Sequence, residues 1–168
     1  MVLTRAELLA SLKNEARILI HLAGKVDPKM LDYRPTPKQR SMLELLQYLT
    51  FMGPTYVDLA KSGHFDPAAW AVLARAASAL TFDQVMGVLA AQGDDYEKRL
   101  ASLSDSDMRA ETELFGRKQS RGSFLVNVLL CSCAAYRMQL FIYLKSCGCD
   151  DLSTTNLWGG MDAPPPKK

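Results

Sequence analysis

Apolar residues recur every three or four positions in four long segments of the chain, which is the spacing of one face of a helix. In the first segment, Thr4 and Glu7 form a capping box, the side-chain pair that satisfies free backbone groups at a helix start. The apolar positions that follow are Leu8, Leu12, Ile18, Leu19, Leu22 and Ala23. Gly24 then suits the end of the helix. The pattern predicts a helix from about residue 4 to residue 24.

Two more capping boxes open the next predicted long helices. Ser41 with Glu44 begins a helix that we expect to end near Gly63, with Pro54 inside it as a place for a kink. Its apolar face comprises Leu45, Tyr48, Leu49, Met52, Tyr56 and Leu59. Thr81 with Gln84 begins a helix that reaches about Leu103. Between these two, Asp66-Pro67 suits a helix start before an alanine-rich run.

The remaining segments read as connections, a final long helix and a tail. Residues 25–40 contain three prolines and predict a connection with one short helical turn after Asp27-Pro28; residues 104–122 predict a loop. The last helix runs from about 123 to 147. With no strand pattern or repeat, the sequence predicts an all-α four-helix bundle over residues 1–150, with long connections. Residues 151–168 form a tail that packs on the bundle through Trp158.

Composition narrows the range of partners. The 168 residues include 48% hydrophobic and 23% charged residues, and the net charge is +2. That balance gives no basic face for nucleic acid or anionic membrane. The N-terminus lacks the apolar core of a signal peptide, and the least polar stretch, residues 124–136, is too short to span a bilayer. We therefore expect a cytoplasmic protein with no nucleic-acid or membrane partner.

The four cysteines predict reduced thiols. Cys131 and Cys133 fall within the last helix, where a cysteine packs as a small hydrophobic residue. Cys147 and Cys149 form a C-x-C pair and not the C-x-x-C of redox and zinc sites. Redox chemistry at this pair remains an alternative.

Three segments carry a family resemblance. Residues 31–35 (Leu-Asp-Tyr-Arg-Pro), the capped helix start at residues 41–49, and residues 136–148, in which Arg-x-Gln-Leu leads to a helix-ending glycine, resemble the DinB-like (DinB/YfiT-type) superfamily in this order. The resemblance implies a four-helix bundle that is often dimeric. It also implies that many relatives hold a divalent metal on three histidines, and that some are thiol-dependent transferases or isomerases.

The metal-binding histidines of that family are missing from this chain. Carried over position by position, they fall on Tyr48, Ser132 and Tyr136. The only histidines, His21 and His64, match no ligand position. Protonated phenols and a hydroxyl are weak metal ligands at neutral pH. We therefore expect no metal at this position and no cofactor.

The same positions define a candidate pocket. Ser132, Tyr136, Gln139 and Tyr143 share one helix face, and Tyr48 should face them from the second long helix. One interpretation is a polar-aromatic pocket for a small organic ligand, with tyrosine hydroxyls as hydrogen-bond donors. The simpler interpretation is that the phenols pair with one another and fill the cavity that a metal site would leave.

Two functions are compatible with these observations. The first is a metal-free small-ligand-binding or interaction bundle. The alternative is a thiol-dependent transferase or isomerase-like enzyme that uses the pocket between the second and last long helices, although a tyrosine of pKa about 10 is a poor base. We also expect a homodimer, because the last helix is apolar nearly all round and one face suffices for the bundle core. The C-terminal tail is an alternative cover for that face.

Overall fold

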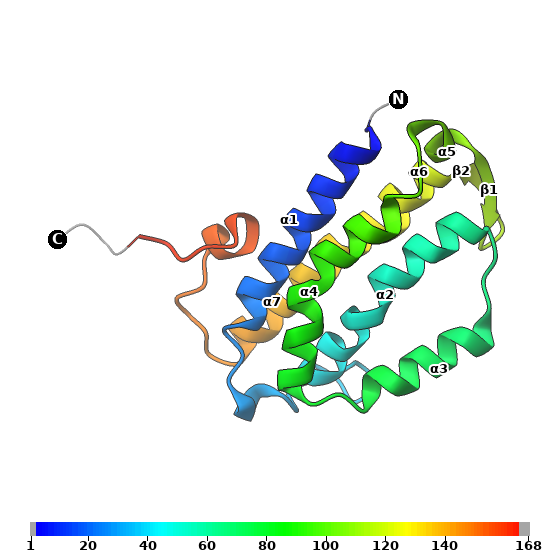
Figure 1. The fold of residues 1–168 in the computed structure, drawn as a ribbon. Helices are drawn as coiled ribbons and strands as arrows, with labels where there is room; N and C mark the ends of the chain where they lie inside the picture. The colour runs from blue at the N-terminus through cyan, green and yellow to red at the C-terminus, as the bar shows by residue number, and fades with distance from the viewer. Residues whose placement is uncertain (1–2, 165–168) are drawn as a thin grey trace.

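A computed structural model describes residues 3–164 and shows four long helices side by side (Figure 1). They are α1 (Arg5–Ala23), α2 (Met42–Ser62), α4 (Phe82–Leu100) and a final helix over Arg121–Ser146. The final helix consists of α6 (Arg121–Phe124), a π-helical stretch η2 (Leu125–Leu130) and α7 (Cys131–Ser146). Helix α1 packs between α4 and α7, while α2 contacts α4 and the final helix. The predicted all-α bundle is confirmed.

The three predicted capping boxes are present and fix where the helices begin. At the start of α1, the Glu7 carboxylate accepts a hydrogen bond from Thr4 N at 2.7 Å, and Thr4 Oγ1 accepts one from Glu7 N at 3.2 Å. The same reciprocal pair forms at the starts of α2 and α4. At the end of α2, Gly63 adopts a φ of 69°, a conformation that a residue with a Cβ atom seldom adopts.

Helix α3 (Pro67–Ser78) lies beside α2 and apart from the main bundle (Figure 1). Asp66 caps its first turn by accepting hydrogen bonds from Ala68 N and Ala69 N. At its other end, the Gln47 side chain on α2 donates to the carbonyl of Ser78 at 3.2 Å and to that of Leu80 at 2.8 Å. These contacts place α3 over the outer face of α2. A short 3₁₀ turn, η1 (Pro28–Met30), forms where Asp27-Pro28 predicted one.

The prediction of a loop over residues 104–122 is wrong. The segment contains a short helix, α5 (Asp105–Arg109), and an antiparallel hairpin of β1 (Glu111–Leu114) and β2 (Arg117–Ser120), with Glu111 opposite Ser120. Phe115 and Gly116, at the two-residue turn, have φ values of 53° and 71°. Such turns normally carry asparagine or aspartate before the glycine, so a phenylalanine there gives no hairpin signal in the sequence.

The bundle core contains one close fit that ties α2 to α4. Tyr96 is 1% exposed, and its ring lies directly against Gly53. A Cβ atom at position 53 would overlap the Tyr96 hydroxyl. Glycine therefore lets a buried tyrosine occupy the space between the two helices.

Among the described residues, one helix, Arg121–Ser146, is long and apolar enough to cross a membrane by length and composition alone. The core helix of a soluble bundle meets the same criterion, so this feature is weak evidence for a membrane. The helix packs against both α1 and α2 here. The cytoplasmic location stays a prediction.

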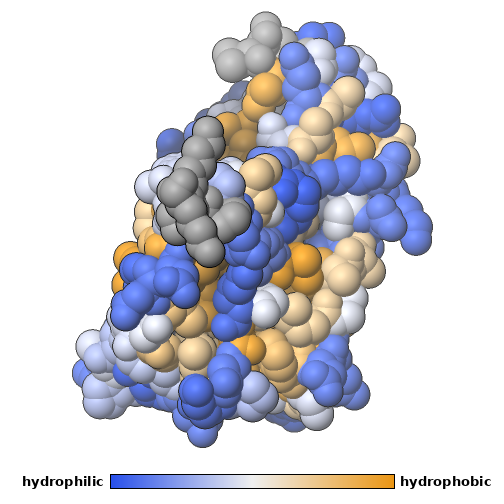
Figure 2. Space-filling view, turned by 90° about the vertical axis from the view of Figure 1, so that its left-hand side faces the viewer, coloured by the Kyte–Doolittle hydropathy of each residue, from blue (hydrophilic) through white to orange (hydrophobic). Residues whose placement is uncertain are grey.

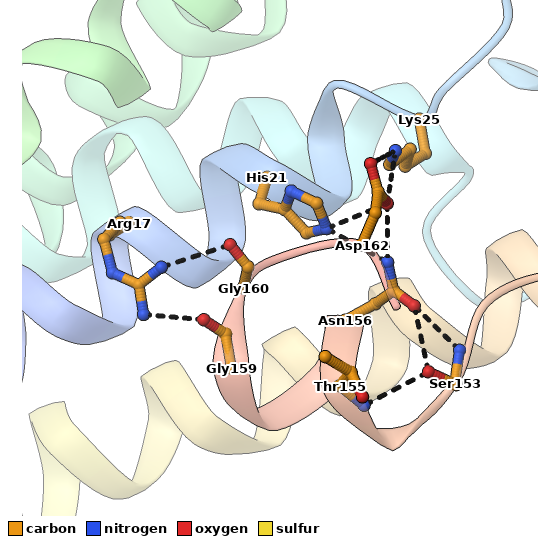
Figure 3. A network of polar contacts seen from close by, with 9 residues as sticks. All are labelled: Arg17, His21, Lys25, Ser153, Thr155, Asn156, Gly159, Gly160 and Asp162. Carbon is orange, nitrogen blue, oxygen red and sulfur yellow. Dashed lines mark hydrogen bonds and ion pairs between the residues drawn. The ribbon is translucent and has the colours of Figure 1, made fainter. Parts of the chain in front are cut away.

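The chain after α7 folds back across α1 and α7 and forms a single π-helical turn, η3 (Thr155–Gly159). The Arg17 guanidinium donates to the carbonyls of Gly159 and Gly160 at 2.8 and 3.1 Å (Figure 3). Trp158, expected to hold this tail, is 62% exposed, whereas Asn156 and Leu157 are buried. Figure 2 shows that apolar and polar residues alternate over the side of the molecule it presents, without one large apolar area.

Candidate functional site: an aromatic cluster between α2, α3 and α7

Five aromatic side chains from three helices meet on the outer face of α2. We call them the aromatic cluster: Tyr48, Phe51 and Tyr56 of α2, Trp70 of α3 and Tyr136 of α7. The ring centres of Tyr48 and Tyr136 are 5.3 Å apart, and those of Phe51 and Trp70 are 5.0 Å apart. Tyr56 stacks on Trp70 at 5.9 Å. All five side chains are only partly buried, so the cluster is open to solvent on one side.

Tyr48 lies at the centre of the polar part of the cluster. Its hydroxyl is within hydrogen-bonding reach of the hydroxyls of Tyr136 and Tyr56. Burial raises the pKa of Tyr48 well above its usual value, and the neighbouring phenols of Tyr56 and Tyr136 add to the rise. At neutral pH Tyr48 is therefore a hydrogen-bond donor and not a phenolate.

A positive charge lies over this phenol. The guanidinium carbon of Arg40 is 4.0 Å from the centre of the Tyr48 ring, a cation–π contact. The backbone of Arg40 is held in place from α7, because the Tyr143 hydroxyl donates to the Arg40 carbonyl at 3.0 Å. The Arg40 side chain itself is exposed. An exposed cation therefore lies against the Tyr48 ring, at a backbone position that α7 holds.

The structure divides the five residues that the sequence grouped into one pocket. Tyr48 and Tyr136 meet, whereas Gln139 and Tyr143 form a separate pair in which Gln139 Nε2 donates to the Tyr143 hydroxyl at 2.7 Å. Tyr143 is 2% exposed and packs on Tyr33 at 5.5 Å between ring centres. Ser132, one turn before Tyr136, is half-buried, and its hydroxyl makes no hydrogen bond within residues 3–164.

Sequence reasoning missed four of the residues around Tyr48, namely Phe51, Tyr56, Trp70 and Arg40. Tyr56 had a usable signal, since it lies eight positions after Tyr48 on the same helix face. Trp70 and Arg40 had no such signal. Trp70 lies on α3 and Arg40 in the connection before α2, and the sequence pattern does not specify how either segment packs. The two histidines lie elsewhere: His21 contacts the Asn156 side chain at 3.1 Å, and His64 is exposed in a turn.

The residues at the family's ligand positions do not suit a metal ion. Tyr48 and Tyr136 offer phenol oxygens, Ser132 offers a hydroxyl, and a cation lies over the site. No cluster of three or more histidine, cysteine, aspartate or glutamate side chains that could hold a metal occurs in the described part of the chain. That the purified protein carries no metal here stays a prediction, which elemental analysis decides.

Cys133, next to Ser132, is poorly suited to nucleophilic chemistry. Its side chain packs against the bundle core, with the sulfur within hydrogen-bonding reach of the Tyr96 hydroxyl. Burial raises the pKa of Cys133 to about 12, so the reactive thiolate is scarce at neutral pH.

Comparison with known proteins supports the fold. No family model matches the sequence, and no curated protein is similar enough to count as a match. Two solved structures share the architecture. A DinB-like protein of Bacillus subtilis, YjoA, is 16% identical, and the similarity covers 87% of this chain and 94% of that one with a TM-score of 0.67. A DinB-like protein of Bacillus cereus is 14% identical, with 88% and 95% covered and a TM-score of 0.70.

Proposed function

Because this chain has the DinB-like fold, we propose that it is a metal-free binding bundle and that the aromatic cluster holds a small organic ligand. The observation that carries the proposal is the group of half-buried phenols around Tyr48, partly open to solvent, with the Arg40 guanidinium against the Tyr48 ring. Aromatic side chains with a few polar groups are typical of the lining of small-molecule sites.

A comparison of the chain's own tyrosines supports this proposal. Tyr96 and Tyr143, which serve the core, are 1% and 2% exposed, and both have a hydrogen-bond partner inside the protein. Tyr48, Tyr56 and Tyr136 keep part of their surface in solvent. Tyrosines that only filled an abandoned cavity would be expected to resemble the first pair.

The enzyme alternative has less support. A thiol-dependent transferase needs a group that activates the thiol, and the raised pKa of Tyr48 makes its phenolate rare at neutral pH. Burial also raises the pKa of Cys133, so its thiolate is scarce at neutral pH. We therefore propose binding as the function and leave catalysis without an assigned residue.

Trp70 provides a direct test, because it belongs to the cluster and Trp158 is the only other tryptophan. In Trp158→Phe protein, titration with a panel of small aromatic and aliphatic compounds should give a saturable change in Trp70 fluorescence for at least one class. The matched variant, Trp70→Phe, retains Trp158 and should show no such change. If no compound of any charge gives saturation, and native mass spectrometry finds no co-purified molecule, the cluster is packing and not a site.

We also propose that two copies associate through α7. Met138 and Ile142, one turn apart on its outer face, are 37% and 51% exposed, while the tail covers the neighbouring face around Arg137. Exposed apolar residues at helical spacing are typical of a protein–protein contact. Sedimentation at micromolar concentration should show a dimer that Ile142→Glu dissociates. A single species of 18.6 kDa for the unmodified protein would contradict the proposal.

A further inference from the structure

The hydrogen-bonding groups around Tyr48 are unbalanced. Each of the three phenols has one O–H proton to donate. Even when Tyr48 bonds with both Tyr136 and Tyr56, two hydrogen bonds use only two of the three protons. No hydrogen bond from these hydroxyls to a carboxylate, amide or carbonyl oxygen is present within residues 3–164. One phenol proton therefore has no acceptor within the described protein and is available to a ligand.

The positive charge of Arg40, like the spare O–H donor, favours a negatively charged ligand. The Arg40 guanidinium makes no hydrogen bond to an acceptor among the described residues, and its five N–H groups are free for a ligand. Glu44, the carboxylate that Arg40 influences, is held by Arg34 at 3.1 Å and by Ser41 N at 2.8 Å. Arg40 is thus a cation without a close carboxylate partner.

The Arg40 guanidinium and the phenol hydroxyls are unsuited to bind a metal ion. A divalent cation needs lone pairs from neutral or negative ligands. The site offers O–H and N–H protons and a positive charge, which attract an anion. An arginine fork also matches the two oxygens of a carboxylate in geometry.

From this arrangement we infer that the ligand is a small organic carboxylate: Arg40 and a phenol hydroxyl bind its carboxylate, and Phe51 and Trp70 contact its apolar body. The inference rests on the proposed function and specifies its ligand class. The aromatic rings favour a flat or branched apolar body, since an inorganic anion has no apolar surface to place against them.

The test compares three probes of one shape and different charge, namely benzoate, benzamide and benzylammonium, by Trp70 fluorescence in Trp158→Phe protein. Benzoate should bind about tenfold or more tightly than benzamide, because a charge-assisted hydrogen bond is stronger than a neutral one by about that factor. Benzylammonium should bind most weakly. Inorganic phosphate should not displace benzoate at equal concentration.

Two variants show whether the preference comes from this site. Arg40→Ala should weaken benzoate binding about tenfold and change benzamide binding by less than about twofold. Lys38→Ala, which removes an exposed cation from the same connection, should leave the ratio of the two affinities unchanged. Circular dichroism and thermal melting of each variant confirm that it is folded.

The possible results distinguish failure of the carboxylate inference from failure of the proposed binding function. Equal affinity for benzoate and benzamide, unaffected by Arg40→Ala, would overturn the carboxylate inference and leave the binding function standing. Preference for benzylammonium would identify a cation site and overturn the inference as well. Failure of all three probes in folded protein, with failure of the wider panel, would remove both the inference and the proposed function.

Discussion

Neighbouring residues of α7 serve two contrasting polar sites. Tyr136 belongs to the aromatic cluster, near the exposed Arg40. Arg137, the next residue, is turned toward α1 and the tail and is 3% exposed. The Arg137 guanidinium is paired with Glu15 of α1 at 2.8 Å, donates to the Leu157 carbonyl and lies 4.8 Å from the Trp158 ring centre. One arginine is enclosed by partners, and the other is open to solvent.

The difference indicates which polar group serves structure and which is available for binding. Arg137 joins α1, α7 and the tail, and its charge is balanced inside the protein. Arg137 Nε and Glu15 Oε2 form an ion pair without a well-aligned hydrogen bond, and the second guanidinium nitrogen donates to Glu15 Oε1 at 3.2 Å. A buried ion pair of this kind makes the packing around it specific. Arg40 has a fixed backbone and a free charged group. A ligand site is therefore better sought where donors lack partners than where the most polar contacts gather.

The largest expected effect comes from Arg137→Leu. The substitution leaves the Glu15 carboxylate buried without a partner, and breaking such a pair typically costs about 3–5 kcal/mol. Urea unfolding should show a loss of that order. The double variant Glu15→Leu with Arg137→Leu should recover most of it, because an apolar pair leaves no unpaired charge. A loss below about 1 kcal/mol for the single variant would show that the pair is not a structural network.

The tail also carries a second group of polar contacts, near the end of α1. Asn156 is 2% exposed, accepts a hydrogen bond from Ser153 N at 2.8 Å and donates to Asp162 Oδ1 at 2.9 Å (Figure 3). Asn156→Ala should lower the free energy of unfolding by about 1–2 kcal/mol, since it removes the hydrogen bonds of a buried amide side chain. Asp162→Asn is the control: its ion pair with Lys25 is exposed, and the loss should stay below about 1 kcal/mol.

The pH dependence of stability isolates Glu15. Burial raises the pKa of Glu15 above its usual value, and Arg137 only partly opposes this rise. The unfolded chain therefore releases the proton first, so the unmodified protein should lose stability relative to Glu15→Gln as the pH rises through the range just above 4.5. Chemical denaturation of both proteins between pH 4 and pH 7 measures the difference. A difference that stays constant with pH would contradict the raised pKa.

The sequence predicted the elements better than their contacts. Capping boxes and apolar spacing are local signals, and they located α1, α2 and α4 because each signal lies within one helix. The hairpin was missed since Phe115 replaces the usual turn residue at a positive φ. The π-helical stretch η2 leaves the apolar pattern of the last helix unbroken, so nothing in the pattern reveals it.

The same reasoning predicted only part of the candidate site. Helical periodicity correctly places residues 136 and 143 on one face, but seven residues advance about 10 Å along the axis. Tyr143 therefore reaches Tyr33 and the Arg40 carbonyl, and Tyr136 reaches Tyr48. Periodicity gives the face of a helix and not the neighbour that covers it, which is why Trp70 and Arg40 were not foreseen.

The smallest expected change in stability is that of Arg40→Ala, and it tests the comparison of the two arginines most directly. Arg40→Ala removes one exposed cation–π contact, which contributes about 0.5–1 kcal/mol at most, and leaves the backbone carbonyl that Tyr143 binds in place. Urea unfolding should therefore show a change below about 1 kcal/mol, several times smaller than that of Arg137→Leu. A loss as large as that of Arg137→Leu would make Arg40 a structural residue and remove the contrast. A small loss in stability together with a large loss of benzoate affinity would mean that the Arg40 guanidinium contributes mainly to binding, because its donors have no partners inside the folded chain.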